Sequence, residues 1–584
     1  MFPKPSSSPS SSPSTASSLP SAVADLVRRM AGPAADPADA ALVARICAEA
    51  VRAIAGGDVC LPLDRIAGLT HDDLLRQDVA SDPETSPAFP DSDPAPAAPP
   101  AAAAFRFPSL PDLTAALLSF PAIVAPPDTP AFAPFILDRD RLYTRRNHRC
   151  ERRIRDRLDT MARPHGAPQT DAPCPPGSST LFPEQLAALQ TILSHPFAIL
   201  TGGPGTGKTH VLARAVQLAL RSDPSLRIRL AAPTGKAAAR MAESLSAAGV
   251  VLPDSPTTLQ HLIGQNPVTG RCRHDAANPL PADWLVIDEA SMVDLLLFGH
   301  VLDALPSSAR LLLIGDPHQL ASVERGRILR DLCDSGRYPL TRLATSHRFG
   351  ADGPIALFAA AVNAGDAPAA LSLLPEASSS PSSPLACTPH PADASRGPDA
   401  WPGFRAAVLA GFDALSRAAT PADALSRINA YRVLCAVRRG PFGVDRANAA
   451  IRAWLPPTAP MPVMVTHNDP SLDVHNGDLG VILPADPDLV WLPGATPDSP
   501  PRSLPRLLLT GLESAWATTI HKSQGSEYDD IAIVLPADPA CPLLTREILY
   551  TAVTRTRRTA RLWTSIPSLR TCISRPVTRA SGFA

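Results

Sequence analysis

The chain has 584 residues, of which 45% are hydrophobic and 19% charged, and its formal net charge is −1. That much apolar material excludes a wholly disordered chain, and the near-zero charge means that any nucleic-acid surface must be local. Ten cysteines without a Cys-x-x-Cys pair argue against zinc ribbons and favour reduced thiols, so we expect a cytoplasmic protein. No apolar run is long enough for a transmembrane helix, and because residues 1–20 are Ser/Pro-rich we expect that they are not a secretory signal.

The N-terminal part is predicted to be a helical domain set between linkers. Residues 1–20 predict disorder, and 21–160 carry apolar residues at helical spacing, interrupted by a Pro/Ala tether over 81–104. Nine arginines gather between positions 139 and 157. Such a cluster is typical of a solvated helix face, and a surface that faces phosphates or a partner is the alternative. A Pro-rich linker, 161–180, ends this part.

From residue 181 onward, short apolar runs alternate with helical segments. Runs that end in a polar or glycine-rich turn are typical of buried parallel strands, which indicates an α/β fold. The predicted strands are Phe197–Thr201, Ile228–Ala232, Trp284–Asp288, Leu311–Gly315, Val433–Val437, Val463–Thr466, Val481–Leu483 and Ile531–Leu535. They divide into two cores, 181–350 and 351–584, with a loose tract over 376–403 in the second.

The first of these strands runs directly into a glycine-rich loop, residues 202–209. Glycines let backbone N–H groups crowd around phosphate oxygens where a Cβ atom would obstruct them. Lys208 would place its ammonium on the β- and γ-phosphates of ATP, and Thr209 would offer a hydroxyl to Mg²⁺. The predicted ATP-binding loop is therefore Gly202, Gly203, Pro204, Gly205, Thr206, Gly207, Lys208 and Thr209.

Two carboxylates end the strand that begins at Trp284. Asp288 can hold Mg²⁺, and Glu289 can polarise an attacking water as a general base. Paired carboxylates at a buried strand end are costly unless a metal or cations compensate them, and an ordinary acidic strand end is the alternative. A water-activating glutamate favours nucleotide hydrolysis over phosphoryl transfer to a metabolite.

Four further segments separate helicases from other nucleotide hydrolases with such a loop. Segment 315–320 places Gln319 where it could sense a γ-phosphate, and segment 346–349 holds Arg348. Alone, Arg348 or Arg555 would be more typical of a surface ion pair than of an arginine finger. In this order and spacing the set is highly specific: 232–240, 315–320, 346–349, and the downstream pair 518–527 and 549–555.

On these residues the chain resembles the superfamily 1 DNA helicases of the 5′→3′ group, and within them the RecD family, the alpha subunits of exodeoxyribonuclease V (RecBCD). The resemblance covers most of 180–565 and thins across 1–180. One departure is Tyr528, where the family tends to show Phe. The segments that carry the resemblance are GGPGTGKT (202–209), APTGKAAAR (232–240), LVIDEASMVD (285–294), GDPHQLASVE (315–324), YRVLCAVRRGPFGVD (431–445), VMVTHNDPSLDVHNGDLG (463–480) and AWATTIHKSQGSEYD (515–529).

The resemblance implies two RecA-like cores with parallel sheets, a small β-barrel insertion over about 463–515, and ATP with Mg²⁺ as cofactors. It assigns Gln185 to the adenine and Glu527 to the ribose. It places two arginines around the γ-phosphate, so the expected catalytic set is Lys208, Glu289, Gln319, Arg348 and Arg555. Single-stranded DNA would lie along Pro233, Thr234, Lys236, Thr258, His261, Thr519 and His521.

The resemblance therefore implies an ATP-hydrolysing 5′→3′ helicase, the motor subunit of a heterotrimer with RecB-like and RecC-like subunits that processes double-stranded DNA ends for recombinational repair. The domain 21–160 has no catalytic constellation and would dock onto a partner. We expect no nuclease site, because none of the four lysines stands in an acid-x-Lys element. A free-standing RecD-like helicase and a non-catalytic, ATP-switched regulatory subunit are the alternatives.

Overall fold

The computed structural model describes two compact units of the chain. The described residues are 19–32, 35–70, 73–74, 105–130, 132–163, 181–322, 324–350, 353–375, 383–389, 397, 401, 403–469, 471–494 and 499–583. The predictions for 1–18, 81–104 and 164–180 fall outside them. Within these spans, no helix is both long and apolar enough to cross a membrane.

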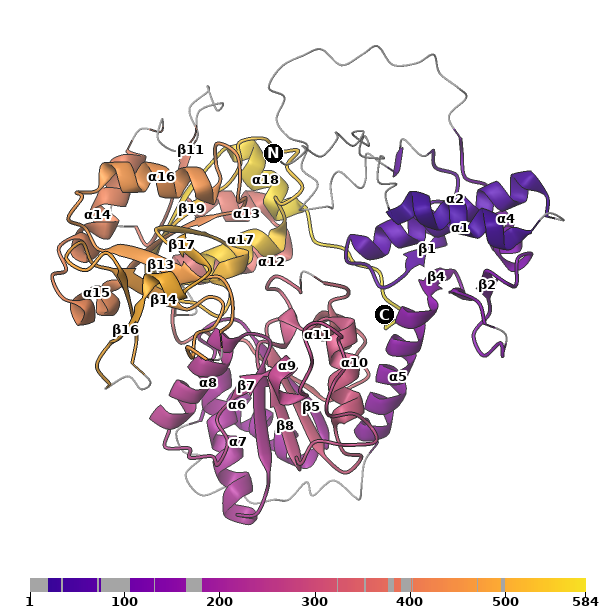
Figure 1. Cartoon of the computed structure of the whole chain (residues 1–584), viewed down its shortest axis with the longest axis horizontal. Helices are drawn as coiled ribbons and strands as arrows, with labels where there is room; N and C mark the ends of the chain where they lie inside the picture. The colour runs from indigo at the N-terminus through magenta and orange to yellow at the C-terminus, as the bar shows by residue number, and fades with distance from the viewer. Residues whose placement is uncertain are drawn as a thin grey trace, which may run out of the picture. The chain divides into compact units, whose positions relative to one another are not determined.

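The smaller unit combines helices with a four-stranded sheet in the order β1-β4-β3-β2. Helix α2 contacts α1, α4, β1 and β4 (Figure 1). Its helices are α1 (Leu19–Ala31), α2 (Pro37–Ala55) and α4 (Leu110–Leu118). Its strands are β1 (Leu61–Pro62), β2 (Val124–Ala125), β3 (Phe135–Asp138) and β4 (Arg141–Thr144). The prediction of a helical domain was incomplete, because strands of two to four residues are too short to show an alternating pattern.

Two predicted boundaries in this part of the chain were wrong. Helix α1 begins at Leu19, inside the segment predicted to be disordered. Helix α5 (Arg145–Ala162) continues into the predicted linker, because Met161 is buried. The part of α5 from Cys150 onward belongs to the larger unit, where the Cys150 thiol donates a hydrogen bond to the carbonyl of Leu295.

The first core of the larger unit is a six-stranded parallel sheet in the order β10-β5-β9-β8-β6-β7. The strands are β5 (Phe197–Gly202), β6 (Ile228–Ala232), β7 (Thr257–Thr258), β8 (Trp284–Ile287), β9 (Arg310–Gly315) and β10 (Leu340–Leu343). The four strands predicted here are confirmed. The edge strands β7 and β10 were missed, because one has two residues and the other is only partly buried.

Helices cover both faces of this sheet (Figure 1). Residues of α6, α7 and α8 share an apolar cluster with alternate strand residues such as Leu200, Leu230 and Leu312. Alternate residues point to one face of a strand, so these three helices cover the same face. The helices are α6 (Pro183–Ser194), α7 (Lys208–Ser222), α8 (Gly235–Ala247), α9 (Leu259–Leu262), α10 (Leu295–Ala304) and α11 (Ile328–Asp334).

The second core is a five-stranded parallel sheet in the order β11-β20-β19-β12-β18. The strands are β11 (Leu385–Pro389), β12 (Tyr431–Cys435), β18 (Ala517–Thr519), β19 (Tyr528–Val534) and β20 (Thr556–Thr564). The tract predicted to be loose therefore contains a strand, whose apolar residues are hidden in the sequence by the flanking Ser, Pro and Ala. The helices are α12 (Pro354–Ala364), α13 (Ala367–Ser372), α14 (Phe404–Ser416), α15 (Pro421–Arg427), α16 (Val444–Trp454), α17 (Arg546–Val553) and α18 (Ile566–Ser574).

A second, antiparallel sheet occupies the predicted insertion between β12 and β18. Its strands pair in the order β16-β15-β14-β13-β17 around a small apolar cluster of its own that includes Val463, Val465 and Val490. They are β13 (Met461–Val465), β14 (Leu479–Ile482), β15 (Leu489–Leu492), β16 (Arg502–Pro505) and β17 (Leu512–Ser514). The insertion is built of short strands as predicted, and its closure into a barrel stays a prediction.

Candidate functional site

The glycine-rich loop between β5 and α7 depends on glycine where it packs against other predicted site residues. Gly205 and Gly207 have φ angles of 77° and 87°, a region that favours glycine. A Cβ on Gly205 would lie 2.5 Å from the Cβ of Arg348, and one on Gly207 would lie 2.5 Å from the Nε2 of Gln185. The fold therefore brings the loop, Arg348 and Gln185 together.

The side chain of Lys208 folds back onto this loop. Its ammonium donates hydrogen bonds to the carbonyl oxygens of Gly202 (2.7 Å) and Gly203 (2.9 Å). Burial lowers the pKa of Lys208, and the carboxylates of Asp316 and Glu289 partly offset that effect. The ammonium thus lies at the loop, among its carbonyl oxygens and nearby acids.

The acidic pair follows β8 at the same edge of the sheet. Glu289 has a left-handed backbone with φ of 51°, which costs a residue other than glycine about 1–3 kcal/mol. Its N–H donates to the Oδ1 of Asp288 at 2.8 Å. Burial and the neighbouring Glu289 raise the pKa of Asp288, so a cation at this carboxylate would relieve an uncompensated charge.

The oxygen donors near the loop suit magnesium. No group of three or more His, Cys, Asp or Glu side chains that could hold a metal occurs in the described parts of the chain. A cation here would have the Thr209 hydroxyl and the Asp288 carboxylate as protein donors. Magnesium commonly takes one or two protein oxygens and completes its shell with water and phosphate, so these residues fit it.

A chain of hydrogen bonds joins the two cores beside the acidic pair. The buried guanidinium of Arg555 donates to the Oε1 of Gln319 at 2.8 Å, and the Gln319 amide donates to Asp316 at 3.2 Å. The hydroxyl of Tyr550 also donates to Asp316, at 2.8 Å. Arg555 and Gln319, both expected around the γ-phosphate, therefore bond each other across the two cores. The sequence did not single out Asp316 and Tyr550, although both stand inside the motifs 315–320 and 549–555.

Glu527 is the centre of a second link between the cores. Its carboxylate accepts from Arg348 at 2.5 Å, from Arg240, and from Arg557 at 3.2 Å. Burial alone would raise the pKa of Glu527, but Arg240 and Arg348 outweigh it and lower the pKa to about 2. Two residues predicted to contact different parts of ATP therefore contact each other, and the sequence missed Arg240.

Gln185 joins the start of α6 to the loop. Its Oε1 accepts from the N–H of Phe182 and its Nε2 donates to the carbonyl of Thr206, both at 3.3 Å. The exposed ring of Phe182 stacks on His347, with centroids 4.4 Å apart and planes at 24°. Gln185 therefore lies at the loop, flanked by a ring pair that the sequence did not indicate. Its contact with the adenine stays a prediction.

The predicted DNA-contacting residues of core 1 follow two adjacent strands. Ala232 at the end of β6 pairs with Thr258 at the end of β7, so the residues that follow both strands share one edge of the sheet. The hydroxyl of Thr234 accepts from the N–H of Ala237 and caps α8. The hydroxyl of Thr258 accepts from His261 in the same way and caps α9. The structure thus gathers Pro233, Thr234, Lys236, Thr258 and His261 at this edge.

The predicted DNA contacts of core 2 lie at the end of β18, where Thr519 is the last residue of the strand. The hydroxyl of Thr519 accepts from the N–H of Lys522 at 3.2 Å, and burial lowers the pKa of His521. The ammonium of Lys522 is paired with Glu513 at 2.8 Å. Thr519 and His521 are therefore neighbours at the end of one strand.

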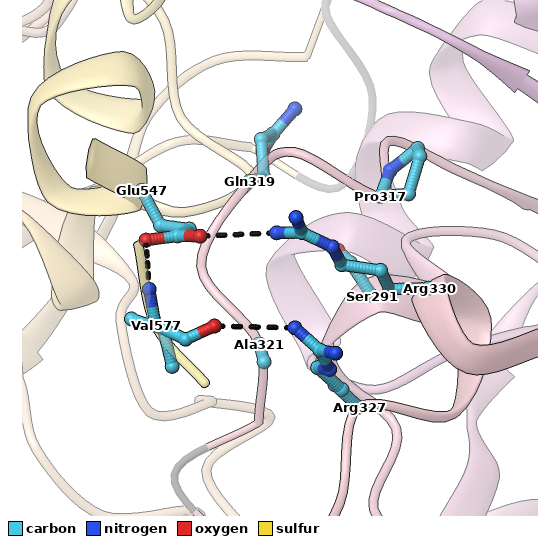
Figure 2. A pocket seen from close by; sticks show the side chains of 8 residues that line it. All are labelled: Ser291, Pro317, Gln319, Ala321, Arg327, Arg330, Glu547 and Val577. Atoms are coloured by element: carbon cyan, nitrogen blue, oxygen red, sulfur yellow. Dashed lines mark hydrogen bonds and ion pairs between the residues drawn. The ribbon is translucent and has the colours of Figure 1, made fainter. Parts of the chain in front are cut away.

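A separate pocket lies next to Gln319, and hydrogen bonds between its lining residues join the two cores (Figure 2). Arg330 donates to Glu547 at 3.0 Å, and Arg327 donates to the carbonyl of Val577 at 3.1 Å. The lining residues are Ser291, Pro317, Gln319, Ala321, Arg327, Arg330, Glu547 and Val577. Only Gln319 belongs to the predicted site, and Figure 2 shows its amide pointing away from the Arg330–Glu547 pair. We interpret this pocket as part of the scaffold.

Comparison with known proteins identifies the family. Family models match an AAA domain over 180–379, a UvrD-like helicase C-terminal domain over 514–563, and the RecBCD enzyme subunit RecD N-terminal domain over 17–143. The RecBCD enzyme subunit RecD of Mycobacterium tuberculosis (strain ATCC 25618 / H37Rv) is 37% identical over 93% of this chain and 90% of that protein. The chain belongs to the RecD family.

Two further relatives are in agreement with this assignment. The RecBCD enzyme subunit RecD of Mycolicibacterium smegmatis is 37% identical over 94% of both chains. An ATP-dependent RecD2 DNA helicase of Deinococcus radiodurans is 30% identical over 65% of this chain but only 48% of its own length. The predicted resemblance to RecD is confirmed, and with it the α/β helicase core with parallel sheets. The chain is a helicase of the RecD family.

Proposed function

We propose that the chain is an ATP-driven motor that moves 5′→3′ along single-stranded DNA. One observation carries this proposal: Arg555 of the second core donates to Gln319 of the first, beside Lys208 and Glu289. A bond between the cores at this place makes the γ-phosphate contacts depend on how the two cores meet. Closing on ATP and opening after hydrolysis would then convert the chemistry into steps along DNA.

In this proposal each residue of the cleft has one task. Lys208 binds the β- and γ-phosphates, and Thr209 with Asp288 holds Mg²⁺, which would neutralise charge on the phosphates. Glu289 accepts the proton of the attacking water. Gln319, Arg348 and Arg555 contact the γ-phosphate, and an arginine in this role is worth about 10³–10⁵ in rate in other NTPases. Gln185 and Glu527 contact the adenine and the ribose.

The same proposal assigns a role to each domain. Residues 181–350 and 351–584 form two RecA-like cores, and single-stranded DNA lies along the edge that gathers Lys236 and His261 and along Thr519 and His521. The antiparallel sheet within 463–515 is a small β-barrel that grips the strand. Such a channel tolerates any base sequence, because it holds the backbone.

We further propose that the chain works as the motor subunit of a RecBCD-type helicase–nuclease with RecB-like and RecC-like subunits, acting at double-stranded DNA ends in recombinational repair. Its two mycobacterial relatives of matching length are named as subunits of that enzyme. Residues 21–160 are the docking domain, and 17–143 match the N-terminal domain model of that subunit. Co-expression with both candidate partners and co-purification tests this point directly. A chain that purifies alone with full helicase activity would favour the free-standing alternative.

Deletion of the docking domain should end before α5, since α5 packs against core 1. Arg157 donates to the carbonyls of Leu305 and Pro306, so a cut inside α5 would damage the motor. A chain lacking residues 1–144 should keep DNA-stimulated ATP hydrolysis and lose its partners. Retained assembly would contradict the docking role.

The direction of movement is tested with forked and tailed duplexes. The purified chain should unwind a duplex with a 5′ single-stranded tail and leave one with a 3′ tail intact, in the presence of ATP and Mg²⁺. A preference for the 3′ tail would reject the 5′→3′ assignment. Binding of ATP without turnover on any DNA would favour the regulatory alternative.

A further inference from the structure

Helix α8 contacts the second core at three successive places. A Cβ on Gly235 would lie 3.1 Å from the side chain of His475, so the start of the helix touches the loop between β13 and β14. Two residues on, a Cβ on Gly525 would lie 3.8 Å from the Cβ of Ala237. At the second turn, Arg240 forms an ion pair with Glu527. One helix of core 1 thus runs along the segment of core 2 that holds the predicted ribose contact.

Arg240 and a predicted DNA contact share one face of this helix. Lys236 and Arg240 are four residues apart, and side chains at that spacing are neighbours on a helix. This part of the helix meets one segment of core 2, because Arg240 pairs with Glu527 and Ala237, next to Lys236, contacts Gly525. Among the described lysines, Lys236 is the one with no hydrogen bond or ion pair, and burial lowers its pKa. A phosphate at the start of α8 would give this ammonium the partner that it lacks.

We propose that Arg240 is a positioning residue that couples DNA contact at the start of α8 to the ATP cleft. The inference rests on the proposed function, since it assigns the coupling between the DNA and ATP sites to one side chain. In this role Arg240 acts through Glu527 rather than through a contact of its own with DNA or ATP. DNA that binds at the first turn of α8 fixes the helix, and Arg240 transmits that position to Glu527.

The charges around Glu527 explain why this residue is needed. Arg240 and Arg348 share one carboxylate oxygen, Oε1, and Arg557 contacts the other. A γ-phosphate would draw Arg348 away, because a multiply charged anion attracts a guanidinium more strongly than one carboxylate. Arg240 then remains as the core 1 partner of Glu527. It keeps the carboxylate ionised and directed across the cleft while Arg348 serves the phosphate.

Arg557 provides a matched control. It pairs with the same carboxylate at 3.2 Å, but it lies in the second core with Glu527 and does not cross the cleft. Both arginine side chains are substantially exposed, at 41% for Arg240 and 56% for Arg557. Replacement of either removes one guanidinium from Glu527 without opening a cavity, so the two variants differ in whether the lost contact joins the cores.

The test compares wild type, Arg240→Gln, Arg240→Lys and Arg557→Gln in the full chain. ATP hydrolysis is measured without DNA and with saturating oligo-dT, together with the KM for ATP and the oligo-dT affinity without nucleotide. Arg240→Gln should lower the ratio of DNA-stimulated to basal turnover by about 5–150-fold, the size of typical coupling between sites. Its oligo-dT affinity should not change. Arg240→Lys should restore part of the ratio, and Arg557→Gln should keep it.

The outcomes distinguish the coupling role of Arg240 from the proposed function. Equal loss of the ratio in Arg240→Gln and Arg557→Gln would overturn the coupling role, because it would mean that both arginines only keep Glu527 ionised. An unchanged ratio in Arg240→Gln would overturn it as well, while the proposed function would stand. A wild-type chain without DNA-stimulated hydrolysis would reject the proposed function and the coupling together.

Discussion

The ATP-facing and DNA-facing sides of the motor differ in how their polar groups are satisfied. On the ATP side, Arg555 bonds Gln319 and Arg348 bonds Glu527, so side chains of one core satisfy those of the other. On the DNA side, Thr234 and Thr258 bond backbone N–H groups one turn further along their own helices. The first kind of contact must change when the cores move, and the second kind need not.

This difference explains how each ligand would act. ATP would replace contacts that the protein already makes, so binding there redistributes partners between the cores. DNA would meet groups whose positions are fixed locally, because a helix cap is set by its own first turn. The contacts on the ATP side are therefore the ones that change when the cores move, and the groups on the DNA side are held in place by their own helices. Each prediction below tests one half of this division.

The largest effect is expected at Arg555. Arg555→Gln removes the guanidinium that joins the cores at Gln319, so ATP turnover with DNA should fall by about 10³–10⁵-fold. Steady-state hydrolysis with saturating oligo-dT measures it. Arg558→Gln is the control, since Arg558 is exposed and pairs with Asp530 outside the cleft. Similar turnover in both variants would mean that the link between the cores is only structural.

The second effect is expected at Glu289. Glu289→Gln keeps the size of the side chain but cannot accept a proton, so turnover should fall by about 10²–10⁴-fold while ATP still binds. Lys208→Ala should weaken binding as well, because its ammonium is the phosphate contact. Equilibrium binding of a fluorescent ATP analogue separates the two variants. Near wild-type turnover in Glu289→Gln would remove Glu289 from the catalytic set.

The sequence predicted the residues at strand ends better than the contacts between the two cores. Loop 202–209, the acidic pair and the capping threonines each stand within a few residues of a buried strand end. Buried strands can be recognised in the sequence as apolar runs, so their ends can be located. The contacts of Arg240 with Glu527 and of Tyr550 with Asp316 join segments more than two hundred residues apart. Nothing in local periodicity reports such pairs, so only the fold could reveal them.

Composition also hid parts of the fold. Strand β11 lies in a tract rich in Ser, Pro and Ala, and the short strands of the smaller unit have too few residues to alternate. Their order follows from pairing with distant partners, as β11 pairs with β20. Pairing over long stretches of chain is set by tertiary contacts, which local propensity does not encode.

A moderate effect is expected on the DNA side. Lys236→Gln removes an ammonium that has no hydrogen bond or ion pair within the described residues, so single-stranded DNA affinity should fall and the slope of log K against log salt should shrink by about 0.7. Lys522→Gln is the control, because Glu513 already pairs its ammonium. Oligo-dT titrations at several salt concentrations give both slopes. An equal change in both variants would show that pairing with protein does not decide which lysines meet phosphate.

The smallest effects are expected in the arginine cluster between 139 and 157. Like the two lysines, its members divide into those that pair with protein groups and those that do not. Arg153 pairs with Asp303 at 3.0 Å, and Arg157 donates to two carbonyls at the end of α10. Arg146 and Arg149 are exposed and, within the described residues, have no hydrogen bond or ion pair. The cluster is therefore not one surface, because part of it fastens α5 to core 1.

Replacing members of each part should separate stability from binding. Arg157→Ala should lower the free energy of unfolding by about 1.5–3 kcal/mol, because it leaves two carbonyls without a charged donor. The double variant Arg146→Ala/Arg149→Ala should stay within about 0.5 kcal/mol of wild type. If the exposed pair faces a partner subunit, that variant should weaken co-purification and keep the salt slope for DNA. A slope that falls by about two units would instead make the pair a phosphate contact, since each neutralised phosphate adds about one.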